Sequence, residues 1–175
     1  RRPPQRILRL SPLLAPGDAN VIGKGSETVL EYDVERYQRQ IPLWGVEGQD
    51  RLRRARVLVG GVGGLGTIIA AYLALAGVGF LRLVDNDRVE ISNLNRQLLF
   101  KATDIGREKA VAATERLQIL NPAIRIEGIN RTLNDGTVDE LIQDIDLIMD
   151  ALDNFTARFL LNRAAFSHRL PLIHG

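Results

Sequence analysis

Three glycines after a short apolar run form the pattern Gly61-x-Gly63-x-x-Gly66, and Asp85 follows at the end of the next apolar run. Because glycine has no Cβ, such a loop lets a strand turn tightly into a helix and lets phosphate oxygens approach the backbone. The free N–H groups at the helix start then face the anion. A carboxylate after the second strand accepts hydrogen bonds from a ribose. The pattern predicts a nucleotide site, with Gly64 as a further glycine of the loop.

Further polar residues come after that second strand, and their types suit a triphosphate. The amide, guanidinium and ammonium donors are Asn93, Asn95, Arg96 and Lys109. A guanidinium offers a planar fork to phosphate oxygens, and an ammonium offers a compact positive charge. Asp153, after a later apolar run, supplies a carboxylate for Mg²⁺, which prefers one or two carboxylates plus phosphate oxygens.

Strands that alternate with helices position these residues. The pattern predicts strands at 56–60, 80–85, 124–129, 146–151 and 171–174, and helices at 64–77, 106–120, 136–143 and 155–168. This alternation predicts an α/β fold, with a Rossmann-like, doubly wound, mainly parallel sheet and helices on both faces. In such a fold the loops after the strands converge on one crevice, where we expect the polar residues to meet.

Both ends of the chain depart from that alternation. Residues 1–34 are rich in Pro and Gly, which predicts an extended, irregular N-terminal arm. Two short helical pieces, 35–44 and 48–54, lead from it to the first strand. The chain stops at Gly175 directly after an apolar strand, as a severed domain would. We therefore expect an arm over 1–34 and an ATP-binding domain over 35–175 that is incomplete at its C-terminus.

Composition excludes several classes of protein. The 23 basic and 21 acidic residues give a net charge of only +2, which does not favour a nucleic-acid partner. The longest apolar stretch, 68–78, is too short to cross a bilayer, and the first residues lack a signal-peptide core. We therefore predict a cytoplasmic protein without a membrane partner. The chain has no cysteine, so we expect neither a disulfide nor a zinc site in it.

Six motifs resemble, in order and rough spacing, those of the ThiF/MoeB-like adenylyltransferases, a superfamily that includes the adenylation domains of ubiquitin-activating enzymes. They lie at residues 36–41, 61–66, 85–87, 92–97, 106–109 and 153–154. The resemblance covers about residues 35–175. It implies an enzyme that binds ATP and Mg²⁺ and adenylates the C-terminal glycine carboxylate of a ubiquitin-fold protein ending in Gly-Gly. Pyrophosphate would be released.

The resemblance also implies roles for single residues. Arg96 and Lys109 would hold the phosphates and relieve charge on the leaving pyrophosphate, and Asp153 would place Mg²⁺. The other implied nucleotide contacts are Gly61, Gly63, Gly64, Gly66, Asp85, Asp87, Ser92, Asn93, Asn95 and Asn154. Asp87 would either help to bind the metal or phosphates or cap its own loop. In the family, the arginine that matches Arg39 reaches the triphosphate across a two-fold interface, which predicts a homodimer with shared active sites.

Two other functions stay open. An NAD-dependent Rossmann oxidoreductase would also use Asp85 on its ribose, although triphosphate-type side chains crowd that region and no hydride-transfer acid or base is evident. A non-catalytic member would use the same fold for dimerisation or binding, although Arg96, Lys109 and Asp153 are all present. Family members often carry a catalytic cysteine or C-x-x-C zinc ligands, and those elements would lie beyond the position that matches Gly175.

Overall fold

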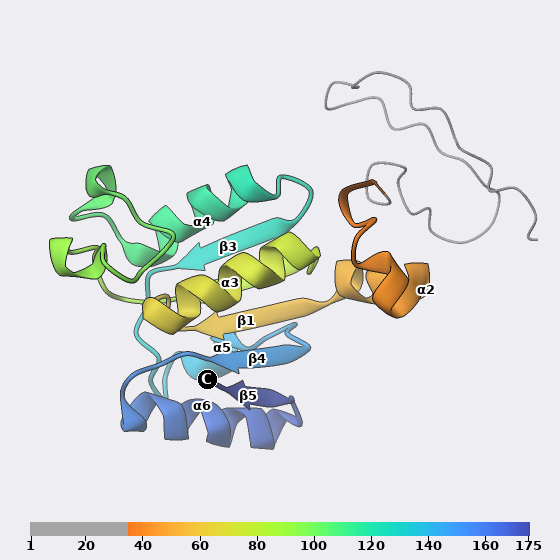
Figure 1. The fold of residues 1–175 in the computed structure, drawn as a ribbon. Helices are drawn as coiled ribbons and strands as arrows, with labels where there is room; N and C mark the ends of the chain where they lie inside the picture. Colours follow the sequence, from red (N-terminus) through yellow and green to blue (C-terminus); the bar gives the residue numbers. More distant parts are fainter. Residues whose placement is uncertain (1–34) are drawn as a thin grey trace, which may run out of the picture. The chain divides into compact units, whose positions relative to one another are not determined.

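A five-stranded parallel sheet forms the centre of the computed structural model, which describes residues 35–175; the predicted arm, residues 1–34, lies outside the described residues (Figure 1). The strands are β1 (Arg56–Gly60), β2 (Phe80–Val84), β3 (Arg125–Ile129), β4 (Leu147–Asp150) and β5 (Leu172–His174). All pairings are parallel and the strand order is β3-β2-β1-β4-β5. This is the order of a doubly wound Rossmann sheet, so the predicted fold class is confirmed.

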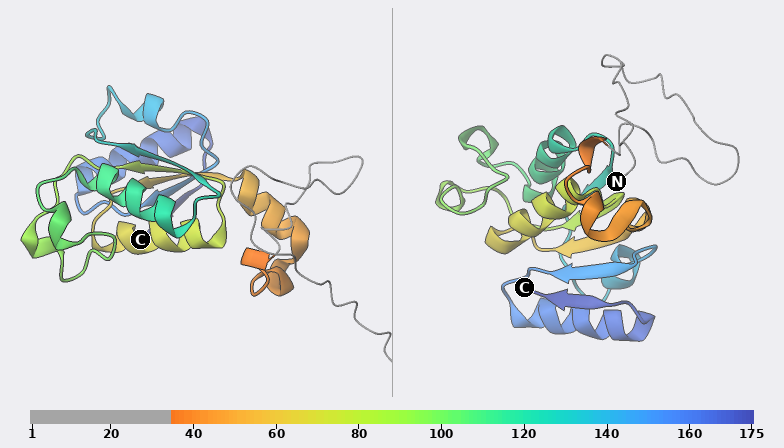
Figure 2. Two further views of the ribbon diagram at one scale, coloured as in Figure 1. Left: turned by 90° about the horizontal axis from the view of Figure 1, so that it is seen from above. Right: turned by 45° about the vertical axis from the view of Figure 1, so that its right-hand side comes forward.

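Helices cover both faces of the sheet, as predicted. They are α3 (Gly64–Ala76) and α4 (Lys109–Leu120) on one face, and α5 (Val138–Leu141) and α6 (Phe155–His168) on the other (Figure 2). In β1, Val57 and Val59 pack in the core with α3 and α4, whereas Leu58 packs in the core with α5 and α6. Because both faces are buried, the central strand β1 is continuously apolar over residues 57–59 rather than alternating.

Several element boundaries differ from the predicted ones. The helix predicted from residue 106 begins at Lys109, because Gly106 has a φ of 86° and residues 106–108 pair with the segment after β2. The helix predicted over 136–143 is only α5, since the chain turns at Asp144 with a φ of 58°. Two helical pieces are present as predicted, since α2 (Ile41–Arg54) is divided by the non-helical Gly45, but residues 37–40 of the first predicted piece form a turn.

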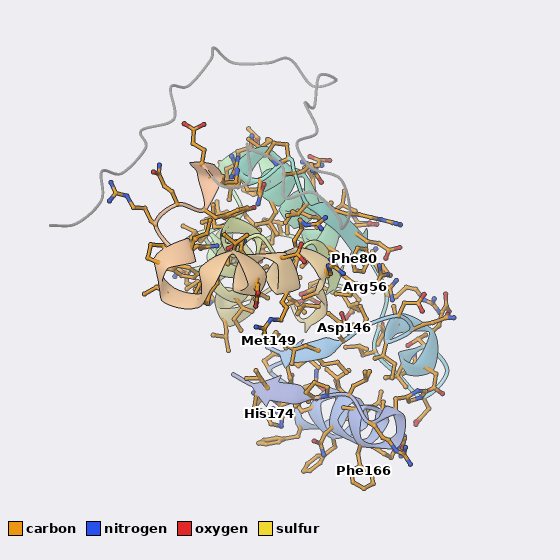
Figure 3. All side chains as sticks on the ribbon, turned by 90° about the vertical axis from the view of Figure 1, so that its right-hand side faces the viewer. Arg56, Phe80, Asp146, Met149, Phe166 and His174 are labelled. Carbon is orange, nitrogen blue, oxygen red and sulfur yellow. The ribbon has the colours of Figure 1, made fainter. Side chains whose placement is uncertain are left out.

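At the amino ends of the strands, neighbouring residues contact one another. The Arg56 guanidinium lies 4.3 Å from the centre of the buried Phe80 ring (Figure 3). The backbone N–H of Arg56 donates to the Asp146 carboxylate at 2.8 Å. On the adjoining side, the Gln40 and Gln49 amides both donate to the carbonyl of Ala76, at the C-terminal end of α3. Residues 37–54 therefore lie at the amino edge of the sheet.

Asn121 ties this N-terminal segment to the helices. Its buried side-chain N–H₂ donates to the Tyr37 hydroxyl at 2.9 Å and to the Ala74 carbonyl at 2.7 Å. We expect Asn121→Ala to lower the free energy of unfolding by about 1–3 kcal/mol, because buried partners lose their hydrogen bonds. Urea unfolding measures the loss. Arg116→Ala, which truncates a side chain of the same helix that bonds to no other group among residues 35–175, should cost less than about 0.5 kcal/mol; equal losses would contradict the prediction.

Among residues 35–175, no helix is long and apolar enough to cross a membrane.

Candidate active site

A cleft of about 950 Å³ opens at the carboxyl ends of the strands. Its lining comes from the loops after β1, β2, β3 and β4 and from the start of α6. The strand order reverses between β1 and β4, so the cleft lies at the topological switch point, where open α/β sheets bind ligands. In Figure 1 these ends are the arrowheads of β1 and β4, on the side away from α2.

The glycine loop between β1 and α3 approaches its neighbours too closely for side chains at two positions. Gly61 has a φ of 88°, and a Cβ there would lie 2.8 Å from the Ala151 carbonyl oxygen. A Cβ on Gly66 would collide with the Gly61 carbonyl. Gly63 and Gly64 line the cleft together with Gly61, but a Cβ on either of them would meet no atom closer than 3.7 Å, so these two positions keep the backbone open to a ligand. The fold thus requires Gly61 and Gly66, whereas the other two glycines leave space for an anion.

Asp85 follows β2 with its carboxylate fixed at the cleft wall. One oxygen accepts the Val62 N–H at 2.7 Å and the other accepts the Asp87 N–H at 2.8 Å. Burial raises the pKa of Asp85 above its ordinary value of 3.8, and the two backbone hydrogen bonds oppose that rise. Each oxygen keeps a free lone pair, so the carboxylate can still accept hydrogen bonds from a ribose.

The raised pKa of Asp85 predicts a pH dependence of stability. Folding disfavours its charged form, so its contribution to stability is greatest below pH 3.8 and falls as the pH rises through the raised pKa. We expect the unfolding free energy of the wild type, relative to Asp85→Asn, to decrease over that interval. Urea titrations of both proteins at several pH values measure this difference. A difference that stays constant or grows would contradict the prediction.

Lys109, the first residue of α4, extends its ammonium to Asp87. The two groups are 2.8 Å apart, and the Lys109 N–H also donates to the Asp87 carbonyl at 3.0 Å. The Lys109 side chain is 8% exposed, whereas that of Asp87 is 62% exposed. Both residues line the cleft. The ion pair and the backbone hydrogen bond with Asp87 therefore hold Lys109 in place.

Arg96 is exposed at the cleft and is held by its own loop. Its guanidinium donates to the Ser92 carbonyl at 2.9 Å and to the Asn95 side-chain oxygen at 3.0 Å. Asn93 is buried and lines the cleft, but its side-chain oxygen accepts the Glu90 N–H and shapes the turn. Ser92 and Asn95 do not line the cleft.

The other cations that line the cleft have carboxylate neighbours. These pairs are Lys109–Asp87, Arg88–Glu108, Arg131–Glu140 and Arg158–Asp150. Within residues 35–175, the contacts of Arg96 are with neutral oxygens and not with a carboxylate. Arg96 therefore has the cleft guanidinium most available to an anionic ligand.

Asp153 and Asn154 follow β4 at the opposite wall of the cleft. Asn154 caps α6, since its side-chain oxygen accepts the Ala157 N–H at 2.8 Å. Asp153 is exposed and bonds to no other group in the described part of the chain. That part also contains no group of three His, Asp or Glu side chains suited to a metal ion. A cation at Asp153 would therefore need phosphate oxygens and water as its other ligands, which fits Mg²⁺.

Sequence reasoning did not assign a role to Arg131, Gln97, Asp150 or Arg158, which the structure brings to the site. Arg131 comes just after β3, so the rule that strand ends converge could have found it. Gln97 is buried beside the glycine loop, and its side-chain oxygen has no partner among the described residues. Asp150 is fully buried, and its carboxylate lies 3.5 Å from Arg158 and 2.6 Å from His174. Only the fold brings these last residues together.

Arg39 lies away from the cleft of its own chain. Its neighbour Gln40 contacts Ala76 at the C-terminal end of α3, whereas the cleft lies at the N-terminal end of that helix. The side chain of Arg39 is exposed.

Comparisons with known proteins agree with this geometry. The model of the ThiF family matches residues 37–175. The chain is 46% identical over 145 residues to the sulfur carrier protein adenylyltransferase of Thermus thermophilus, covering 82% of this chain and 54% of that protein. It is 42% identical over 147 residues to the molybdopterin-synthase adenylyltransferase of Escherichia coli K12, covering 83% and 59%. The chain thus spans just over half the length of these two relatives.

Solved structures show the same arrangement of the chain. The E. coli tRNA N6-threonylcarbamoyladenosine dehydratase TcdA, in complex with ATP, superimposes with a TM-score of 0.79 at 26% identity, over 82% of this chain and 60% of that one. E. coli MccB with MccA-N7isoASN gives a TM-score of 0.74 at 30% identity, over 79% and 43%. Since the family model matches most of the chain, this protein belongs to the ThiF family.

Proposed function

We propose that this protein is an ATP-dependent adenylyltransferase. It activates the C-terminal glycine carboxylate of a ubiquitin-fold, sulfur-carrier-like protein as an acyl-adenylate and releases pyrophosphate. The observation that carries the proposal is the cleft at the switch point, where Arg96 bonds to no carboxylate of residues 35–175 and its side chain lies next to Gly64. The names of the Thermus and E. coli relatives support the reaction class and the sulfur-carrier substrate. A cytoplasmic location stays a prediction.

The proposed reaction requires charge neutralisation more than proton transfer. A carboxylate oxygen of the acceptor attacks the α-phosphorus of ATP, the bond from that phosphorus to the bridging oxygen breaks, and pyrophosphate leaves with the electron pair. Both reactants are anions, so catalysis depends on positioning and electrostatic stabilisation. Arg96 and Lys109 would hold the phosphates, and Asp85 would accept hydrogen bonds from the ribose. Mg²⁺, held by Asp153 and phosphate oxygens, would neutralise further negative charge.

The proposed enzyme is a homodimer that shares Arg39 between active sites. Support comes from the outward side of α3, which exposes a stripe of large apolar side chains: Leu65, Ile68, Tyr72 and Leu75. Their spacing of three and four residues puts them on one helix face. Two copies packed antiparallel along this stripe would bring the Arg39 end of one copy to Leu65 of the other. Leu65 lines the cleft.

Whether the protein binds ATP or NAD distinguishes the proposed function from the oxidoreductase alternative. We expect ATP with Mg²⁺, and not NAD, to raise the melting temperature, because a ligand that binds only the folded state stabilises it by mass action. Differential scanning fluorimetry with both nucleotides measures the shifts. A shift with NAD and none with ATP would overturn the proposal.

The reaction itself is tested by exchange of radiolabelled pyrophosphate into ATP in the presence of a ubiquitin-fold protein ending in Gly-Gly. The proposal requires exchange that depends on this acceptor. The matched control is the same acceptor without its last glycine. A protein that binds ATP but supports no exchange with any such acceptor would fit the non-catalytic alternative instead.

A further inference from the structure

Among the described residues, the Asp87 carboxylate is hydrogen-bonded to one side chain, the ammonium of Lys109. The partners differ sharply in burial, because the lysine is 8% exposed and the aspartate 62% exposed. A buried ammonium needs a compensating charge, whereas an exposed carboxylate is solvated without one. Lys109 therefore depends on this pair much more than Asp87 does.

The backbone fixes where the Asp87 carboxylate lies relative to α4. The Asp87 N–H donates to Asp85 at 2.8 Å, and its carbonyl accepts the Lys109 N–H at 3.0 Å. The next residues continue this contact through an antiparallel bridge between Arg88 and Glu108. The end of β2 and the start of α4 are thus joined by a short ladder, and the ion pair lies beside it.

We propose that Asp87 is a positioning residue that directs Lys109 into the cleft, and that it binds neither nucleotide nor metal itself. A free lysine side chain samples many rotamers, and ordering it costs free energy when the ligand binds. The contact with Asp87 orders it before the ligand arrives. The role of Lys109 in binding phosphates rests on the proposed function. The ion pair between Lys109 and Asp87 is seen in the structure and does not depend on that function.

Pyrophosphate exchange tests the positioning role in a double-mutant cycle. Asp87→Asn keeps the side-chain shape and should lower kcat for exchange by about 10- to 100-fold, because small misplacements of a reacting group are costly. In the Lys109→Ala background the same substitution should cause no further loss, since the residue through which it acts is gone. Asp87→Glu, which keeps a carboxylate, should retain more activity than Asp87→Asn.

The matched control is Glu115→Gln. Glu115 is an α4 carboxylate of similar exposure, 57%, that pairs with Arg107 outside the cleft lining, so exchange should stay within about twofold of wild type. Two results would overturn the proposal. One is a further loss from Asp87→Asn in the Lys109→Ala background, which indicates direct binding by Asp87. The other is tighter ATP binding by Asp87→Asn, which indicates that Asp87 competes with phosphate.

A second measurement does not depend on catalysis. Labelling with an amine-reactive reagent, read by mass spectrometry, reports the accessibility of each lysine in the free protein, with the exposed Lys101 as internal reference. Asp87→Asn should increase labelling of Lys109 several-fold relative to Lys101, and Glu115→Gln should not. Unchanged labelling overturns the positioning role even where exchange is observed. Increased labelling without exchange in the wild type supports the positioning role and rejects the proposed function.

Discussion

Arg96→Ala should lower the rate of ATP–pyrophosphate exchange by about 10²–10³-fold, by analogy with removal of one preorganised donor from an oxyanion site. The guanidinium is held in place by the Ser92 carbonyl and the Asn95 side-chain oxygen, and in the described part of the chain it has no carboxylate partner that phosphate would have to displace. Its aliphatic part lies next to Gly64, at the start of α3. In the proposed reaction, the substitution therefore removes positive charge from the place where negative charge would accumulate on the leaving group.

Exchange of labelled pyrophosphate into ATP measures this loss. Lys109→Ala should give a loss of similar size, about 10²–10³-fold, because it removes the second cation assigned to the phosphates. Arg116→Ala is the matched control, since it removes an arginine from α4 outside the cleft lining and should leave exchange nearly unchanged. Exchange that survives both Arg96→Ala and Lys109→Ala would overturn the assignment of these residues.

The positions of the strands and of the glycine loop could be predicted because their causes are local. A run of apolar residues such as 56–60 is long enough for a strand and is followed directly by glycines. The parallel sheet then follows from the alternation of strands and helices, and the convergence of Asp85, Lys109 and Asp153 on one cleft follows from the sheet. Each step uses only order along the chain, so the sequence alone was sufficient.

The pairing of charges in the cleft could not be predicted in the same way. Asp87 and Lys109 are separated by 22 positions and meet only because residues 106–108 pair with the segment after β2, which also delays the start of α4. Arg158 meets Asp150 because α6 packs beside β4. Ser92 and Asn95, whose contacts with nucleotide stay a prediction, bond to Arg96 or to their own loop in this structure.

Arg39→Ala should lower exchange by about 10²–10³-fold, as loss of a cationic contact to the triphosphate would. Its position argues against action within its own subunit. The cleft lies at the N-terminal end of α3 and the neighbour of Arg39 contacts the C-terminal end, so the 13 residues of this helix separate them by roughly 20 Å. An arginine side chain is too short to span that distance, so any phosphate that Arg39 reaches belongs to another copy of the chain.

Mixing two inactive variants tests this sharing directly. When equal amounts of Arg39→Ala and Arg96→Ala subunits re-associate at random, half of the dimers are mixed, and each mixed dimer has one site with both lesions and one with none. Exchange should therefore return to about one quarter of the wild-type rate, because a two-fold interface makes both sites equivalent. If Arg39 instead served its own cleft, every site in a mixed dimer would carry one lesion and no activity would return. Since neither variant recovers alone, activity in the mixture can come only from a site built from two subunits.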